Sequence, residues 1–398
     1  MKTVKLGEIA ELTVGFVGSM TEQYVDKGVP FLRSLNIKPF EINNDDIRYI
    51  SDEFNKKIKK SILHSGDVVI VRTGAPGTCC VVPDEYDGCN CSDVVIVRPN
   101  TEQVDPLYLA GFVNFWGQKQ ISNNKVGAIQ QHFNVRIAEE MLIMLPDLDE
   151  QRKIGKVLGN LNTKISANKA INDNLYACMK TEYEQYFIQF NFPYNGKPYS
   201  QFGGKMKWSE TLGRDIPEKW HVAPLHEVAD LQYGYPLSTD YFGNDGTPVI
   251  RIRDIEGNDF SARTTEPVDN CYLTQPQDLL IGMDGNFQMN FWHKQGYLVN
   301  QRITRIRKKS FPVMLIKFQI EPYISAKSQN VARSTVGHLS DDDIKGLQIL
   351  IPSEEFDFTG FDDALSIIIR NINENDRLIQ LRDWLLPMLM NGQASISD

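Results

Sequence analysis

The chain has 398 residues, of which 41% are hydrophobic and 23% are charged, a composition typical of two or three globular domains. Its 42 Lys and Arg against 51 Asp and Glu give a net charge of −9, which argues against a uniformly basic surface for nucleic acid. No stretch reaches the roughly 18–20 apolar residues of a membrane span, and MKTVKLGEIAEL lacks the pattern of a signal peptide. We therefore expect a soluble cytoplasmic protein with no membrane contact.

Four segments of the first half of the chain return in the second half, in the same order. The pairs are EIAELTVGF (8–16) with EVADLQYGY (227–235), GVPFLRSLNI (28–37) with GTPVIRIRDI (246–255), GDVVIVRTG (66–74) with QDLLIGMDG (277–285), and IMLP (143–146) with ILIP (349–352). A repeat of this length predicts two similar domains, because the repeats of a solenoid are only about 20–50 residues long.

Residues 1–147 are predicted to form the first of these domains. GDVVIVRTG and DVVIVRP (93–99) are short apolar runs that end at Gly and Pro, which is typical of strands. Four cysteines lie close together in this part of the chain, at positions 79, 80, 89 and 91. Their spacing is poor for a tetrahedral zinc site, so reduced thiols on strands are favoured over a metal site.

Residues 148–190 are predicted to form a long helix. Asp147 precedes it as an N-cap, with Glu150 three residues on. Apolar residues then recur at alternating spacings of four and three, as in a coiled coil. The seam is Ile154, Leu158, Leu161, Ile165, Asn168, Asn172, Leu175, Met179, Glu182 and Tyr186. The alternative is a single amphipathic helix that packs on a globular body.

The second half of the chain repeats this organisation. Residues 191–216 are rich in Gly, Pro, Asn and Tyr and are predicted to be a connector. The second strand-rich domain is expected at 217–353, and a second helix at 358–392, with Pro387 loosening its last turn. The seam of that helix is Phe361, Leu365, Ile368, Ile372, Asn375, Ile379, Arg382, Leu386 and Leu389, in which Arg382 interrupts the apolar pattern.

Two helices that each follow one copy of the same domain can bury their seams against each other. Antiparallel pairing is expected, because it makes the two halves of the chain equivalent by a pseudo-two-fold axis. Asn168, Asn172 and Asn375 would then fix the register of the pair. The predicted fold is α+β: two similar strand-rich domains separated by two long helices that form an antiparallel coiled coil at most about 55–60 Å long.

The order of these segments resembles the specificity subunit of type I restriction-modification enzymes. The resemblance covers the whole chain and rests on GKPYSQFGGKMKW (196–208), RDIPEKW (214–220), DLLIGMDGNF (278–287), LVNQRI (298–303) and LRDWLLPMLMNG near the end. It implies that each strand-rich domain is a target-recognition domain for one half of a split site in double-stranded DNA. It also implies two modification (methyltransferase) subunits on the helical spacer, and restriction (helicase-nuclease) subunits that join for cleavage.

Catalytic motifs are absent from the sequence. The nearest approach to a methyltransferase N/D-P-P-Y/F motif is NFPY (191–194), which has no glycine-rich cofactor turn upstream. There is no G-x-x-x-x-G-K-[ST] phosphate loop and no H-E-x-x-H zinc motif. We expect a non-catalytic chain without a cofactor or metal of its own. S-adenosylmethionine, ATP and Mg²⁺ are expected on the partner subunits.

Base reading requires side chains with paired donors and acceptors on turns that can reach a groove. The same turns occur in both repeats with different polar residues, as expected of different readers on one scaffold. The candidate DNA-binding residues are Arg33, Asn36, Arg72, Thr73, Gln130, Gln131, His132, Arg251, Arg253, Asp284, Asn286, Arg302, Arg333, Thr335 and His338. Two basic runs, 56–60 and 305–309, are expected to contact phosphates. The competing interpretations are a protein–protein scaffold without DNA contact and, less favoured, a chain that itself modifies DNA.

Overall fold

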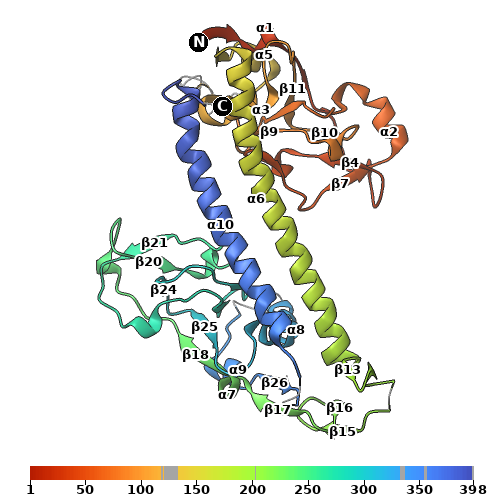
Figure 1. Ribbon diagram of the computed structural model, residues 1–398, viewed down its shortest axis with the longest axis vertical. Helices are drawn as coiled ribbons and strands as arrows, with labels where there is room; N and C mark the ends of the chain where they lie inside the picture. The colour runs from red at the N-terminus through yellow and green to blue at the C-terminus, as the bar shows by residue number, and fades with distance from the viewer. Residues whose placement is uncertain (118–119, 121–132, 202, 332–336, 354–355, 397–398) are drawn as a thin grey trace. The chain divides into compact units, whose positions relative to one another are not determined.

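The computed structural model describes residues 1–117, 120, 133–201, 203–331, 337–353 and 356–396 (Figure 1). The chain divides into two compact units. The first consists of Met1–Ser166 with Arg377–Asp398, and the second of Ala167–Asp376. Each unit therefore contains one strand-rich body and one part of each of the two long helices, α6 (Leu148–Tyr183) and α10 (Thr359–Met390).

The body of the first unit has two four-stranded sheets and two short strand pairs. The larger sheet is antiparallel, in the order β2 (Ala10–Val14), β11 (Val94–Pro99), β8 (Val68–Val71), β9 (Cys79–Val81). The smaller sheet has the order β10 (Asn90–Cys91), β4 (Val29–Leu32), β7 (Arg48–Ile50), β3 (Tyr24–Val25), with β10 parallel to β4. The pairs are β1 (Lys2–Lys5) with β12 (Leu142–Leu145) and β5 (Ile37–Lys38) with β6 (Glu41–Ile42). The short helices are α1 (Leu6–Ile9), α2 (Asp52–Lys57), α3 (Pro106–Phe112) and α5 (Val135–Glu139).

The body of the second unit repeats the two four-stranded sheets and the β1–β12 pair of the first, but its described residues form no counterpart of the β5–β6 pair. Its larger sheet has the order β18 (Ala229–Tyr233), β25 (Ile303–Lys308), β22 (Leu279–Gly282), β23 (Met289–Phe291). Its smaller sheet has the order β24 (Leu298–Val299), β20 (Thr247–Ile250), β21 (Ala262–Thr264), β19 (Phe242–Gly243), with β24 parallel to β20. The pair β17 (His221–Pro224) with β26 (Gln348–Ile351) corresponds to β1 with β12. The helices are α7 (Leu225–Val228), α8 (Val313–Val331) and α9 (Asp341–Lys345). The prediction of two similar strand-rich domains is confirmed.

The connector between α6 and the second body contains two hairpins, β13 (Pro193–Tyr194) with β14 (Lys197–Pro198) and β15 (Met206–Ser209) with β16 (Arg214–Pro217). Its aromatic residues contribute to the core of the second unit. Phe192 stacks on Trp220 with ring centroids 4.9 Å apart, and Phe187 lies 5.2 Å from the same ring. This segment has no hydrophobic periodicity, but its aromatic residues make it an ordered connector.

The central strand of each larger sheet is buried on both faces. On β8, Val68 and Ile70 face one apolar cluster, whereas Val69 and Val71 face another. On β22, Leu279 and Ile281 face one cluster and Leu280 the other. A strand that is covered on both sides needs apolar residues at every position, which explains why these runs do not alternate with polar residues.

The helix predictions agree with the structure in their main features. The Asp147 carboxylate accepts a hydrogen bond from the Glu150 N–H at 2.9 Å, as an N-cap should. The seam residues Ile154, Leu158 and Ile165 are buried. Helix α10 continues through Pro387 to Met390. Arg382, which interrupts the seam, places its guanidinium over the Phe40 ring, 4.7 Å from the centroid.

Buried asparagines join the two long helices within the second unit. Asn168 donates to Glu374 at 2.7 Å and to Asn375 at 2.9 Å. Asn371 donates to Asn172 at 2.9 Å, so the partner number on α10 falls as the number on α6 rises. The helix segments of this unit are therefore antiparallel, and the predicted interior asparagines are confirmed. A buried amide costs free energy unless it is paired, so these contacts favour one register.

The four clustered cysteines are buried and free, with Cys79 in one apolar cluster and Cys80, Cys89 and Cys91 in another. Burial raises the pKa of the Cys89 thiol to about 12. Over the described ranges, no three or more His, Cys, Asp and Glu side chains gather where they could hold a metal ion. In the same ranges, no helix combines the length and the apolar character that a membrane span requires.

A buried histidine, His293, links the body of the second unit to α10 through a hydrogen bond. His293 donates from Nε2 to the Asp376 carboxylate at 3.1 Å, and Lys294 binds the same oxygen at 2.7 Å. Asn373 donates to the His293 carbonyl at 3.2 Å. Burial lowers the pKa of His293 below its usual value of about 6.5. Burial raises the pKa of Asp376, but the contacts with Lys294 and His293 outweigh it and lower that pKa overall.

This arrangement predicts that acidification weakens the second unit. Because the folded-state pKa of His293 lies below the unfolded value, its contribution to stability is complete above about pH 6.5 and is lost as the pH falls through the folded-state pKa. We expect the free energy of unfolding of the wild type to decline over this range relative to that of His293→Gln, which cannot titrate. Chemical unfolding of both proteins between pH 8 and pH 5 measures the difference. Parallel pH profiles would contradict the assignment.

Candidate nucleic-acid interface

Three turns meet at one end of the larger sheet in the second unit, and the described part of the first unit contains the corresponding segments, the third of them from Phe133 onward. The first turn follows β8 or β22, the second precedes β11 or β25, and the third precedes α5 or α9. In the second unit, Met283 N–H donates to the Arg302 carbonyl at 2.9 Å, and Leu339 N–H donates to the Met283 carbonyl at 2.8 Å. In the first unit, Arg72 N–H donates to the Asp93 carbonyl at 3.1 Å. The same backbone hydrogen bond thus joins the first two turns in both units, and we call this arrangement of turns the platform.

The second unit places three predicted residues together on this platform. Asp284 Oδ1 lies 2.8 Å from His338 Nδ1, and Asp284 Oδ2 lies 3.5 Å from Arg302 Nε. The side chains of Arg302 and His338 remain about half exposed, at 55% and 47%. Asp284 therefore orients one guanidinium and one imidazole while both keep surface available to a ligand.

Asn286 is exposed on the same turn and borders a hollow of about 460 Å³. The other lining residues are Glu256, Gln288, Met289 and Asn290. Gln288 reaches Glu256 at 3.4 Å, and Asn290 donates to the backbone carbonyls of 255 and 256. The wall of the hollow is thus rich in amide groups, which can pair with the edge of a base.

The first unit presents different side chains on the same platform. Thr73 occupies the position of Asp284, because each is the second residue after the buried strand. Arg72 is half-buried and donates from Nε to the Phe133 carbonyl at 3.1 Å. Phe133 and Leu339 are both buried, and each precedes the N-cap of a short helix.

The sequence of the chain was compared with models of known protein families. Residues 1–177 and 217–374 match the model described as "Type I restriction modification DNA specificity domain". The chain belongs to this family.

Several curated relatives are specificity subunits of type I restriction enzymes. The chain is 29% identical over 141 residues to the EcoBI subunit of Escherichia coli, which covers 34% of this chain and 30% of that protein. It is 24% identical over 270 residues to the MjaVIII subunit of Methanocaldococcus jannaschii, covering 67% and 55%. The match to the HindI subunit of Haemophilus influenzae is 20% identical and covers 90% and 92%. The chain thus spans about a third to a half of the first two relatives.

A solved structure has the same fold. The S subunit of a type I restriction-modification system from M. genitalium superposes with a TM-score of 0.59, at 13% identity, over 98% of this chain and 95% of that chain.

Other residues that the sequence predicted to bind DNA lie in a second pair of equivalent turns, one in each unit of this DNA specificity subunit family member. Asn36 is fully buried; it accepts from Arg33 N–H at 3.0 Å and donates to the Asn43 and Asp45 carbonyls. The amide oxygen and nitrogen of Asn36 are thus both bonded inside the domain, so Asn36 anchors the turn and does not reach a base. The side chain of Arg33 binds Asp46 at 2.9 Å, and this hydrogen bond is the main cause that lowers the pKa of Asp46.

The second unit repeats this turn with a carboxylate. Asp254 is buried, and it accepts from Arg251 N–H at 2.9 Å and from Ser261 Oγ at 2.8 Å. The Arg251 guanidinium lies over the Phe242 ring, 5.2 Å from the centroid. Arg253 is largely exposed, with its Nε 3.3 Å from Ser261 Oγ, and is the member of this turn best placed to meet a ligand.

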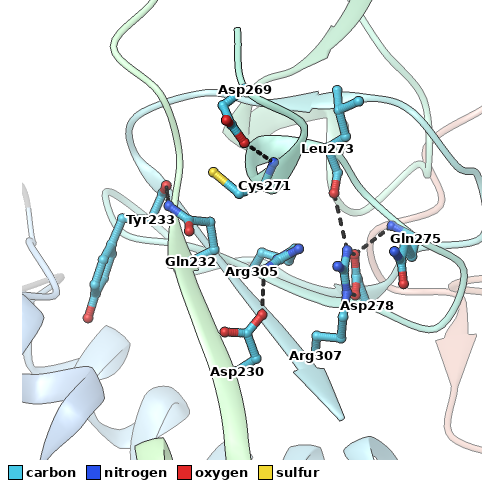
Figure 2. A network of polar contacts seen from close by, with 10 residues as sticks. All are labelled: Asp230, Gln232, Tyr233, Asp269, Cys271, Leu273, Gln275, Asp278, Arg305 and Arg307. Carbon is cyan, nitrogen blue, oxygen red and sulfur yellow. Dashed lines mark hydrogen bonds and ion pairs between the residues drawn. The ribbon is translucent and has the colours of Figure 1, made fainter. Parts of the chain in front are cut away.

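Within the basic run at 305–309, for which the sequence suggested phosphate contacts, Lys308 and Lys309 are exposed, but Arg305 and Arg307 are held by carboxylates of the same domain. Arg305 is buried and donates to Asp230 at 2.8 Å. Arg307 holds the buried Asp278 through two hydrogen bonds of 2.7 and 2.8 Å, and it also donates to the Leu273 carbonyl at 3.1 Å (Figure 2). Both arginines are internal parts of the second domain. Alternation along β25 places them on the same face as Ile303, which packs with residues of the smaller sheet.

Five of the predicted residues lie outside the described residues: Gln130, Gln131, His132, Arg333 and Thr335. One candidate was missed by sequence reasoning. Asp93 precedes β11 as Arg302 precedes β25, and its side chain is exposed. The signal was the pairing of DVVIVRP (93–99) with RITRIRK (302–308), in which Val94 aligns with Ile303, Val97 with Ile306 and Arg98 with Arg307, although the first residues differ.

Proposed function

We propose that this chain is the DNA-recognition subunit of a type I restriction-modification system. Each unit would read one half of a bipartite duplex target through its platform. The observation that carries the proposal is the duplicated platform itself: one backbone arrangement presents Asp284, Arg302 and His338 in one unit, and Arg72, Thr73 and Asp93 in the other. A constant scaffold with variable polar tips is what two readers of different sequences require.

The charge of the chain supports a partner-dependent binding mode. With a net charge of −9, the chain supplies little of the phosphate neutralisation on which DNA affinity depends. In this proposal two modification subunits dock on the helical spacer and contribute basic surface and methyl transfer with S-adenosylmethionine. Restriction subunits that use ATP and Mg²⁺ would add cleavage. The chain itself would be non-catalytic, with recognition domains at 1–147 and 217–353 and spacer helices at 148–190 and 358–392.

The proposal predicts a split methylation target. We expect the complex of this chain with its modification subunits to methylate two short half-sites separated by an unread spacer. Readers on one face of the duplex would put the half-site centres about one helical turn, roughly 10 bp, apart. Methylated-site sequencing of a random-sequence DNA library measures the motif, and the mass of the complex measures its stoichiometry.

Two controls decide between the proposal and its alternatives. A reaction without this chain should give no sequence-specific methylation, and a reaction with this chain alone should give no methylation at all. If the modification subunits select the same sites without this chain, it is only a scaffold. If this chain alone transfers methyl groups, it is an enzyme.

A further inference from the structure

Positions 93 and 302 are the same place in the two domains. The strand registers establish this, because Val94 pairs with Val71 and Ile303 pairs with Gly282 at the corresponding ends of the two larger sheets. The hydrogen bonds that Val94 and Ile303 accept also correspond, from Gly15 at 2.9 Å and from Gly234 at 2.9 Å. The residue before each strand therefore occupies the same place in the sheet, although only Asp93 has a left-handed backbone.

The two equivalent positions carry opposite charges. Asp93 is an exposed carboxylate held on a left-handed backbone, with φ of 57°. Arg302 is an exposed guanidinium. The neighbours on the platform differ accordingly, since the second unit places Asp284 3.5 Å from Arg302 Nε, whereas the first unit has Thr73 at the position of Asp284.

Building on the proposed function, we infer that positions 93 and 302 are specificity-determining positions, at which Asp93 selects a cytosine in one half-site and Arg302 selects a guanine in the other. An exposed carboxylate only accepts, and in the major groove cytosine offers the N4 amino group as a donor. A guanidinium only donates, and guanine offers O6 and N7 as paired acceptors.

The contacts of Arg302 suit this role. Asp284 Oδ2 lies 3.5 Å from Nε, while the arginine side chain stays 55% exposed. Within the described residues, the ion pair with Asp284 is made through Nε and leaves both terminal nitrogens available to an acceptor on the DNA. A guanidinium that is oriented by one carboxylate loses less conformational entropy when it binds a base than one that is free to rotate.

The test substitutes each residue by the amide closest to it in shape. Asp93→Asn suits the left-handed backbone, because Asn adopts positive φ more readily than most residues. Arg302→Gln keeps a polar side chain that can pair with adenine. Each variant is assembled with the modification subunits, and its methylation motif is sequenced from the random-sequence library.

We expect Asp93→Asn to reduce the preference for cytosine at one position of the first half-site by about 5- to 150-fold, with a shift toward adenine. Arg302→Gln should do the same for guanine at one position of the second half-site. The other half-site should stay unchanged in each case. Lys207→Gln, which removes an exposed positive charge from β15 of the connector, is the charge-matched control for Arg302→Gln and should leave the motif intact.

The outcomes separate this inference from the proposed function. A wild-type complex without a bipartite motif would contradict the function. A normal wild-type motif that neither variant changes, in proteins with wild-type melting temperatures, would contradict the inference alone. A variant that degrades both half-sites equally would show that its residue acts on assembly and would also overturn the inference. Arg302→Lys, which retains charge but not the paired donors, should weaken the guanine preference and thereby exclude a purely electrostatic effect.

Discussion

Replacing Arg307 by Ala is expected to destabilise the second unit by about 3–5 kcal/mol, because it leaves a carboxylate buried without its charge partner. Asp278 is 1% exposed, and both of its oxygens are held by Arg307. Asp278 Oδ2 also accepts from Gln275 N–H at 2.7 Å, so the pair links β25 to the loop before β22 (Figure 2). Losing Arg307 therefore removes a cross-link as well as a charge.

The duplication supplies a matched control for this variant. Arg98 and Asp67 occupy the corresponding positions in the first unit, but Arg98 Nε lies 3.6 Å from the carboxylate and the arginine side chain is 33% exposed. Burial raises the pKa of Asp67, so this carboxyl is less firmly held as an anion. We expect Arg98→Ala to cost clearly less than Arg307→Ala. Hydrogen exchange of the amides in β22 and β25, compared with those in β8 and β11, assigns each loss to its unit. Equal losses of stability in the two variants would mean that the Arg307–Asp278 pair contributes no more than the Arg98–Asp67 pair.

Deleting one heptad from α6 alone is expected to abolish sequence-specific methylation, with a loss of more than about 100-fold. The Asn168–Asn375 and Asn172–Asn371 pairs require one register of the two helices, and seven residues shift the helix by about 10 Å. Removing 160–166 from α6 would therefore leave these amides, or the apolar seam on the other side of the deletion, without partners.

A paired deletion should restore the activity with a shorter unread spacer. Removing 378–384 from α10 together with 160–166 takes out facing segments, since Asn162 receives a hydrogen bond from Arg382 at 3.3 Å. The bases preferred in each half-site should not change, because both platforms are retained. Methylated-site sequencing reports spacing and base preference in one experiment. If the paired deletion changes the preferred bases but not the spacing, the helices are not a spacer. Deleting three residues instead of seven, which breaks the phase of the seam, is the control that should fail in every context.

The sequence alone was sufficient to predict the duplicated organisation and the helices. Three signals can be read directly along the chain: collinear repeats, strand runs bounded by Gly and Pro, and apolar residues at alternating spacings of four and three. Each of them reports on an element or a repeat without knowledge of the residues that pack against it. The interior asparagines were also predictable, because the seam itself placed Asn168 and Asn375 among apolar positions. The pseudo-two-fold relation between the units stays a prediction.

Which polar side chains face solvent was decided only by the tertiary structure. Arg305 and Arg307 belong to a basic run, yet carboxylates at 230 and 278, far away in the sequence, neutralise them inside the domain. Asn36 satisfies carbonyls that a turn brings to it, whereas Asp93 and Arg302 become equivalent only when the strand registers are compared. Sequence periodicity records which face of an element is buried. It does not record which distant backbone or charge meets a polar group there, because that depends on how the strands pair.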